Sequence, residues 1–157
     1  MIKMTRIDYR LLHGQVAFAW TKNLSANAIL IANDDVVNDS FRKRTLNLAK
    51  PNDTKLIFKS VDDSINAIKS GVTDKYSVFI VVENVHDAYR MAKGTSEVDK
   101  VNLGLSAKRE NTTNIAKAVY VSDSEISELK ELADSGVEVL VKQAPNDSNV
   151  DFYSLIN

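Results

Sequence analysis

The sequence of 157 residues contains no cysteine, two prolines and five glycines. The absence of cysteine excludes disulfides, thiolate nucleophiles, iron–sulfur clusters and cysteine-ligated zinc. The five glycines are too far apart in the chain to form a dinucleotide-binding fingerprint or a Walker loop, so no nucleotide cofactor is supported. No apolar run approaches the roughly 20 residues that cross a bilayer, and the N-terminus lacks a signal-peptide pattern. These features are compatible with a reducing cytoplasm.

An excess of charge of either sign is also missing. The chain has 20 Lys and Arg residues against 21 Asp and Glu residues, a formal net charge of −1. Such a balance gives no general attraction for nucleic acid, so no nucleic-acid partner is predicted. His13 and His86 are the only histidines, which excludes a histidine-rich metal site. The length, with 44% hydrophobic and 26% charged residues, predicts one globular domain over residues 1–157.

Short apolar runs rich in β-branched residues alternate with segments of helical period, which is the pattern of a parallel sheet covered by helices. We predict an α/β fold, a single domain with an open, mostly parallel sheet of about seven strands and helices on both faces. The predicted strands are Met4–Ile7, Ala28–Ala32, Lys55–Lys59, Ser77–Val82, Lys100–Leu103, Ala118–Val121 and Val137–Val141. The predicted helices are Gln15–Asn23, Asp39–Lys50, Asp62–Ser70, Val85–Lys93 and Ser124–Ser135. The polar segment Leu105–Asn114 is interpreted as a solvated connector at the rim of the sheet.

The loop after the first predicted strand carries Arg10 and His13 directly before an amphipathic helix. In open α/β sheets, ligands bind beyond the carboxyl ends of the strands, where this loop is expected. Unprotonated imidazole is a nucleophile near neutral pH, and the N–H groups at a helix start favour an anion. A guanidinium offers a planar fork to phosphate oxygens. The pair is therefore a candidate for holding and exchanging a phosphoryl group, although a His-Gly pair at a helix entrance, taken alone, is usually structural or simply exposed.

Acidic residues follow the second predicted strand, at Asp34 and Asp35. An acidic pair at that position can hold a divalent metal, but the site then needs a further aspartate after the third strand. The segment Lys55–Ser60 supplies none. We therefore interpret Asp34 and Asp35 as turn and helix-capping residues and predict no metal.

The segment Arg6-Ile7-Asp8-Tyr9-Arg10-Leu11-Leu12-His13-Gly14-Gln15-Val16, followed by Trp20, resembles the N-terminal signature of a known family. This family comprises the enzyme IIB components of the mannose/fructose/sorbose type in the bacterial phosphotransferase system. The resemblance continues through Ile31–Asp34, Arg42-Lys43, Ala49–Pro51, Val101–Gly104, Lys117–Ser122, Leu129–Val139 and Pro145. Many members have the pattern Asn-x-Gly-Gly-Met where this chain has Asn102-Leu103-Gly104-Leu105-Ser106, which leaves open the sugar transporter that it serves.

The resemblance implies a phosphoryl carrier that requires no cofactor. His13 would accept a phosphoryl group on its imidazole Nδ1 from the phosphohistidine of a cytoplasmic IIA protein. It would then pass the group to a sugar that enters through the membrane IIC–IID complex. Arg10 matches the family arginine that neutralises the phosphoryl group. The expected phosphate-binding loop consists of Asp8, Leu12, Gly14 and Gln15.

The basic residues Arg42, Lys43 and Arg44 have two interpretations. Such a triplet commonly forms a solvated helix face, but Arg42 matches a family residue that meets the IIA surface. Arg42 and Lys43 are therefore predicted docking residues. Because the chain begins directly at the signature, we expect the IIA protein to be a separate polypeptide and this protein to act in the cytoplasm, peripherally at the permease. The alternative from another class is a regulatory or anion-binding α/β module without catalysis.

Overall fold

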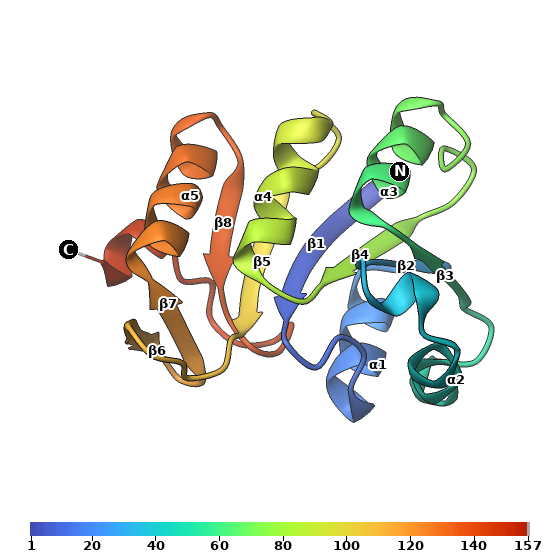
Figure 1. Ribbon diagram of the computed structural model, residues 1–157, viewed down its shortest axis with the longest axis horizontal. Coiled ribbons are helices and arrows are strands. Elements are labelled where there is room, and N and C mark those ends of the chain that lie inside the picture. The colour runs from blue at the N-terminus through green and yellow to red at the C-terminus, as the bar shows by residue number, and fades with distance from the viewer. Residues whose placement is uncertain (157) are drawn as a thin grey trace.

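The computed structural model describes residues 1–156 and contains a six-stranded sheet in which every neighbouring pair of strands is parallel (Figure 1). The strand order is β3-β2-β4-β1-β5-β8. The strands are β1 (Ile2–Asp8), β2 (Ala28–Ala32), β3 (Lys55–Lys59), β4 (Val78–Val82), β5 (Lys100–Leu105) and β8 (Glu138–Val141). Both β2 and β4 are buried along their whole length, because helices cover both faces of the sheet. This burial explains their uninterrupted apolar sequences and confirms the predicted α/β class.

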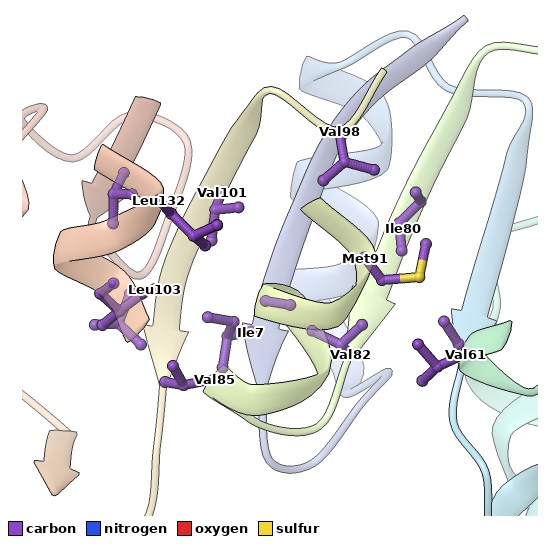
Figure 2. Packing of buried hydrophobic residues seen from close by; sticks show 14 of the residues in the cluster. Ile7, Val61, Ile80, Val82, Val85, Met91, Val98, Val101, Leu103 and Leu132 are labelled. Atoms are coloured by element: carbon purple, nitrogen blue, oxygen red, sulfur yellow. The ribbon is translucent and has the colours of Figure 1, made fainter. Parts of the chain in front are cut away.

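Helices α1 (Gly14–Asn23) and α2 (Ser40–Ala49) pack on one face of the sheet, on a core that includes Trp20, Ile31 and Phe79. Helices α3 (Val61–Lys69), α4 (Val85–Gly94) and α5 (Asp123–Asp134) cover the other face. The chain also contains two short 3₁₀ helices, η1 (Val36–Asn38) and η2 (Phe152–Leu155). Figure 2 shows Val85 and Met91 of α4 against the strands of that second core.

Helix starts follow the capping residues in the sequence. The side chains of Asp39, Ser60, Asn84 and Ser122 each accept a hydrogen bond from a backbone N–H in the first turn of α2, α3, α4 and α5. Such caps satisfy donors that have no partner inside the helix. The described residues include no helix that is both long and apolar enough to cross a bilayer.

One predicted strand, Ala118–Val121, lies outside the main sheet. Strand β7 (Val119–Ser122) pairs antiparallel with β6 (Thr112–Ala116), a strand that the polar sequence of the Leu105–Asn114 segment did not indicate. The residue that ends their short turn, Ala118, has a left-handed φ of 59° without being a glycine. The predicted connector is therefore partly a hairpin, joined to the end of β5 by the bridge between Ser106 and Val119.

Strand β1 lies at a topological switch point of the sheet. The helix that follows β1 lies on one face and the helix that follows its neighbour β4 lies on the other. Chain segments therefore diverge from the carboxyl ends of these adjacent strands, and such switch points are where open α/β sheets bind ligands. The loop from Tyr9 to His13 leaves β1 at this point (Figure 1).

Candidate functional site

Two leucines anchor the loop between β1 and α1. Leu11 and Leu12 are 2% and 4% exposed and belong to the same core cluster as Trp20 and Val36. Leu11 adopts a left-handed φ of 63°, a conformation that is unfavourable for a leucine. Burial of its side chain offsets that strain, and the backbone N–H of Leu11 donates to the carbonyl of Asp8 at 2.9 Å. The buried side chains of Leu11 and Leu12 therefore fix the loop to the apolar core.

His13 stands at the N-cap of α1 and is exposed. No side chain caps this helix and its first turn contains no acidic residue. The first backbone N–H groups of a helix have no partner within it and attract an anion. Gly14 has a left-handed φ of 50°, and Gln15 is exposed beside it. The predicted members Leu12, Gly14 and Gln15 thus surround His13 at an open helix N-terminus.

Arg10 is fixed by Asp8 through three hydrogen bonds. Its backbone N and its side-chain Nε donate to Oδ1 of Asp8 at 2.9 and 3.2 Å, and its Nη2 donates to Oδ2 at 3.2 Å. The Arg10 side chain remains 25% exposed, whereas that of Asp8 is 2% exposed. Within residues 1–156, Nη1 of Arg10 has no protein partner. Asp8 therefore orients one edge of the guanidinium and leaves another free for a ligand.

A second arginine, Arg6, lies buried behind this pair at 2% exposure. Its Nη2 donates to Oδ2 of Asp8 at 3.3 Å, and its Nη1 donates to Oδ1 of Asn102 at 2.6 Å. Burial lowers the pKa of Arg6 from its ordinary value, and the carboxylate of Asp8 acts in the opposite direction. The guanidinium also lies 5.6 Å from the centroid of the Trp20 ring, within cation–π range.

The chain forms a fitted pocket around the Arg6 guanidinium, and sequence reasoning missed it. Asn102 is directly paired with Arg6 across β1 and β5, and its own Nδ2 donates to the carbonyls of Leu140 and Lys142. Those bonds turn its Oδ1 toward the arginine. Gly104, two residues along β5, leaves space that the guanidinium fills. The motif Asn102-Leu103-Gly104 was a sequence signal for this pocket, although its partner could not be read from one strand.

Replacement of Gly104 by alanine is expected to destabilise the fold by about 1–3 kcal/mol through overpacking. A Cβ at this position would lie 2.4 Å from Cζ of Arg6, so the buried guanidinium would have to move. Denaturant unfolding measures the loss. In an Arg6→Met background the clashing atoms are absent, and Gly104→Ala should then cost much less. An equal cost in both backgrounds would contradict this contact.

The surface next to the loop is hollowed by a cavity of about 360 Å³, whose lining includes Tyr9, Glu83 and Arg109. Arg109 is not free to bind an anion there, because its Nη2 donates to Glu125 Oε1 at 2.8 Å and to the carbonyl of Tyr120 at 3.2 Å. Arg10 is therefore the better candidate among the nearby arginines to face a phosphoryl group.

The predicted docking residues lie near the same edge of the sheet. Arg42 of α2 contacts Glu83, the residue after β4, with Nη2 3.2 Å from Oε2, and its side chain is 40% exposed. Lys43 is half-buried. The Arg42 charge is therefore partly balanced within the chain.

Of the two acidic residues after β2, Asp34 has a structural role, whereas the side chain of Asp35 makes no capping hydrogen bond. Asp34 Oδ1 accepts the backbone N–H of Val61 at the start of α3, and its Oδ2 accepts Nη1 of Arg90 at 2.8 Å. These hydrogen bonds lower the pKa of Asp34. Among residues 1–156, no group of three or more His, Asp and Glu side chains could hold a metal ion.

Comparison with known proteins identifies relatives across the full chain. Residues 2–157 match the family described as PTS system sorbose subfamily IIB component. A probable phosphotransferase enzyme IIB component of Streptococcus pyogenes serotype M6 is 31% identical, with both chains covered completely. The sorbose-specific EIIB component of Klebsiella pneumoniae is 31% identical over 99% of this chain and 95% of its own.

Solved structures agree with these sequence relatives. The IIB domain of the sorbose permease from Klebsiella pneumoniae superposes with a TM-score of 0.94 at 31% identity, covering 100% of this chain and 96% of that one. The N-acetylgalactosamine-specific IIB component 1 from Escherichia coli gives a TM-score of 0.91 at 26% identity, covering 97% and 99%. In the mannose-specific EIIAB component of Escherichia coli, this chain matches 49% of a longer protein at 31% identity.

Proposed function

This chain belongs to the sorbose subfamily of IIB components of the bacterial phosphotransferase system, and on that premise we propose that His13 carries its phosphoryl group. Members of this family are phosphotransferases of sugar uptake systems, so the chain is a phosphoryl carrier with a sugar as the final acceptor. IIB components work with a IIA component, which is fused to IIB in the mannose-specific protein, and with membrane IIC and IID components.

The observation that supports His13 most strongly is its position at an uncapped helix N-terminus, three residues after an arginine that Asp8 holds in place. The helix start and the Arg10 guanidinium both favour a phosphoryl dianion. His13 is exposed, as a group that reacts first with a IIA protein and then with a sugar at the permease must be. Asp8 positions Arg10, while the backbone from Leu12 to Gln15 forms the anion-binding loop.

The proposed reaction is two successive displacements at phosphorus. In the first, an unprotonated nitrogen of His13 attacks the phosphoryl group on the IIA histidine. A P–N bond forms to His13 as the donor P–N bond breaks, and the donor imidazole keeps the released electron pair. In the second, a sugar hydroxyl oxygen attacks and an O–P bond forms as the P–N bond to His13 breaks, with the imidazole of His13 keeping the electron pair and the hydroxyl proton passing to solvent. Both steps depend on in-line positioning and on stabilisation of the equatorial oxygens, which Arg10 supplies.

Phosphorylation of the intact protein tests this assignment. Incubation with phosphoenolpyruvate, the general phosphotransferase proteins and a cognate IIA protein should add one acid-labile phosphate per chain, measured as intact mass. An anion-binding or regulatory module would bind phosphate without gaining covalent mass. The proposed setting is the cytoplasm, with a cytoplasmic IIA protein as donor and the IIC–IID sugar permease as acceptor.

We expect Arg42→Glu to slow IIA-dependent phosphorylation at low salt, with the difference from the wild type shrinking as salt rises. A carrier that exchanges partners in each turnover needs a small, polar, transient interface, in which rim charges act mainly on association and are screened by salt. The substitution also places two glutamates together, because Arg42 contacts Glu83. Initial rates at two ionic strengths measure the effect.

Lys43→Glu is the companion variant, since Lys43 neighbours Arg42 on α2 and takes part in no ion pair with another residue of the described chain. It should show the same salt-dependent loss if this helix end meets an acidic IIA surface. Rates equal to the wild type for both variants at both salt concentrations would mean that the triplet is only a solvated face.

A further inference from the structure

We propose that Arg6 is a positioning residue whose buried charge keeps the Asp8–Arg10 unit net positive toward the phosphoryl group. This inference rests on the proposed function, because it assigns a role in the same transfer. Arg6 contributes nothing to the surface, being 2% exposed, and it acts through Asp8.

The Asp8–Arg10 pair carries no net charge by itself. Both carboxylate oxygens of Asp8 accept hydrogen bonds from the Arg10 side chain, so the two together form a neutral ion pair. A neutral pair orients Arg10 well but offers little net attraction to an incoming dianion. Arg6 adds a second cation on Oδ2 of the same carboxylate, at 3.3 Å. The three side chains then carry one net positive charge, and Arg10 is the member that reaches the surface.

The pocket around Arg6 indicates that a guanidinium is required there. Burial of a charge is costly unless it is paired and hydrogen-bonded, and a packed apolar side chain is often the more stable choice. Here the chain supplies a carboxylate on one side, an oriented Asn102 oxygen on another and the Trp20 ring nearby. Gly104 leaves room that any larger residue would fill. An apolar side chain at position 6 would be enough to stabilise the fold. We therefore infer that the pocket keeps a charged residue there for another reason.

The hydrogen bonds on Asp8 allow the net charge of the three side chains to be changed while most of the bonds that orient Arg10 are kept. Oδ1 accepts both the backbone N and the Nε of Arg10, while Oδ2 accepts Nη2 of Arg10 and Nη2 of Arg6. An asparagine at position 8 keeps an acceptor at Oδ1 and removes the negative charge. Combination of Arg6→Met with Asp8→Asn therefore restores the net charge of the unit while retaining two of the three bonds to Arg10.

The test follows the rate of phosphoryl transfer from phospho-IIA to the intact protein as phospho-IIA concentration is raised. We expect Arg6→Met to lower the maximal rate about tenfold, because one nearby charge is lost at the transition state, with the half-saturating concentration changed less than about twofold. Arg6→Lys, which keeps the charge, should stay within about threefold of the wild type. The double variant Arg6→Met/Asp8→Asn should recover most of the lost rate, although it removes more hydrogen bonds.

Arg90→Met is the control, since it also removes an arginine that is paired with carboxylates, on α4. Its rate should equal that of the wild type. Arg6→Gln is a second neutral variant in case Arg6→Met does not fold, which circular dichroism reports. A double variant no faster than Arg6→Met, or neutral variants as fast as the wild type, overturns the inference. Absence of phosphate on the wild type would instead contradict the proposed function.

Discussion

Substitution of His13 by alanine should abolish covalent phosphorylation of the protein. The imidazole is the proposed attacking group, and exposure at the open N-terminus of α1 makes it accessible to a partner. No other side chain of this loop is a nucleophile near neutral pH without a strongly shifted pKa. Intact mass after the phosphoenolpyruvate-driven reaction measures the loss, and unfolding curves should remain close to those of the wild type.

The second histidine of the chain is the natural control. His86 lies on α4, where its Nδ1 is 2.5 Å from Oε2 of Glu128. His86→Ala should be phosphorylated as fast as the wild type. Retention of the phosphate by His13→Ala would remove the basis of the account, because the phosphoryl group would then sit elsewhere.

Replacement of Arg10 by lysine should slow phosphoryl transfer about tenfold to a hundredfold, equivalent to roughly 1.4–2.8 kcal/mol in the barrier. The guanidinium holds both oxygens of Asp8 through Nε and Nη2 and still has Nη1 to offer a phosphate oxygen. An ammonium group keeps the charge but cannot hold the carboxylate and the phosphoryl group in that planar arrangement. Stability should change little, because the Arg10 side chain is 25% exposed.

Single-turnover transfer from phospho-IIA measures the effect, with Arg44→Lys as a control that makes the same exchange on an exposed face of α2. The control should match the wild type. An Arg10→Lys protein that transfers phosphate at the wild-type rate would mean that the planar fork is unnecessary.

Much of the main sheet could be predicted because its inner strands are largely buried and therefore have apolar sequences. The bounds of β2 and β3 agree with the prediction, since each is a run of five residues between polar or turn-forming neighbours. Strand β6 could not be predicted in the same way. Its sequence, Thr-Thr-Asn-Ile-Ala, is mostly polar, and its hairpin lacks the glycine turn that usually signals such a unit.

In the candidate site, residues close together in the sequence could be predicted, whereas contacts between residues far apart in the sequence could not. Arg10 and His13 lie within one short loop, so their spacing and the helix that follows were visible in the sequence. The contact between Arg6 and Asn102 joins residues 96 positions apart and depends on the register of β1 against β5. No local pattern encodes that register. The left-handed Leu11 was equally hidden, because propensity disfavours it and only tertiary burial stabilises it.

The most direct test of the account identifies the atom that bears the phosphoryl group in the wild-type protein. Phosphorus–nitrogen correlation NMR of the ¹⁵N-labelled phosphoprotein separates the two histidines and the two nitrogens of each ring. We expect a single phosphoryl group on His13, on Nδ1, with His86 unmodified. A phosphoryl group on His86, or on any residue other than His13, would contradict the account.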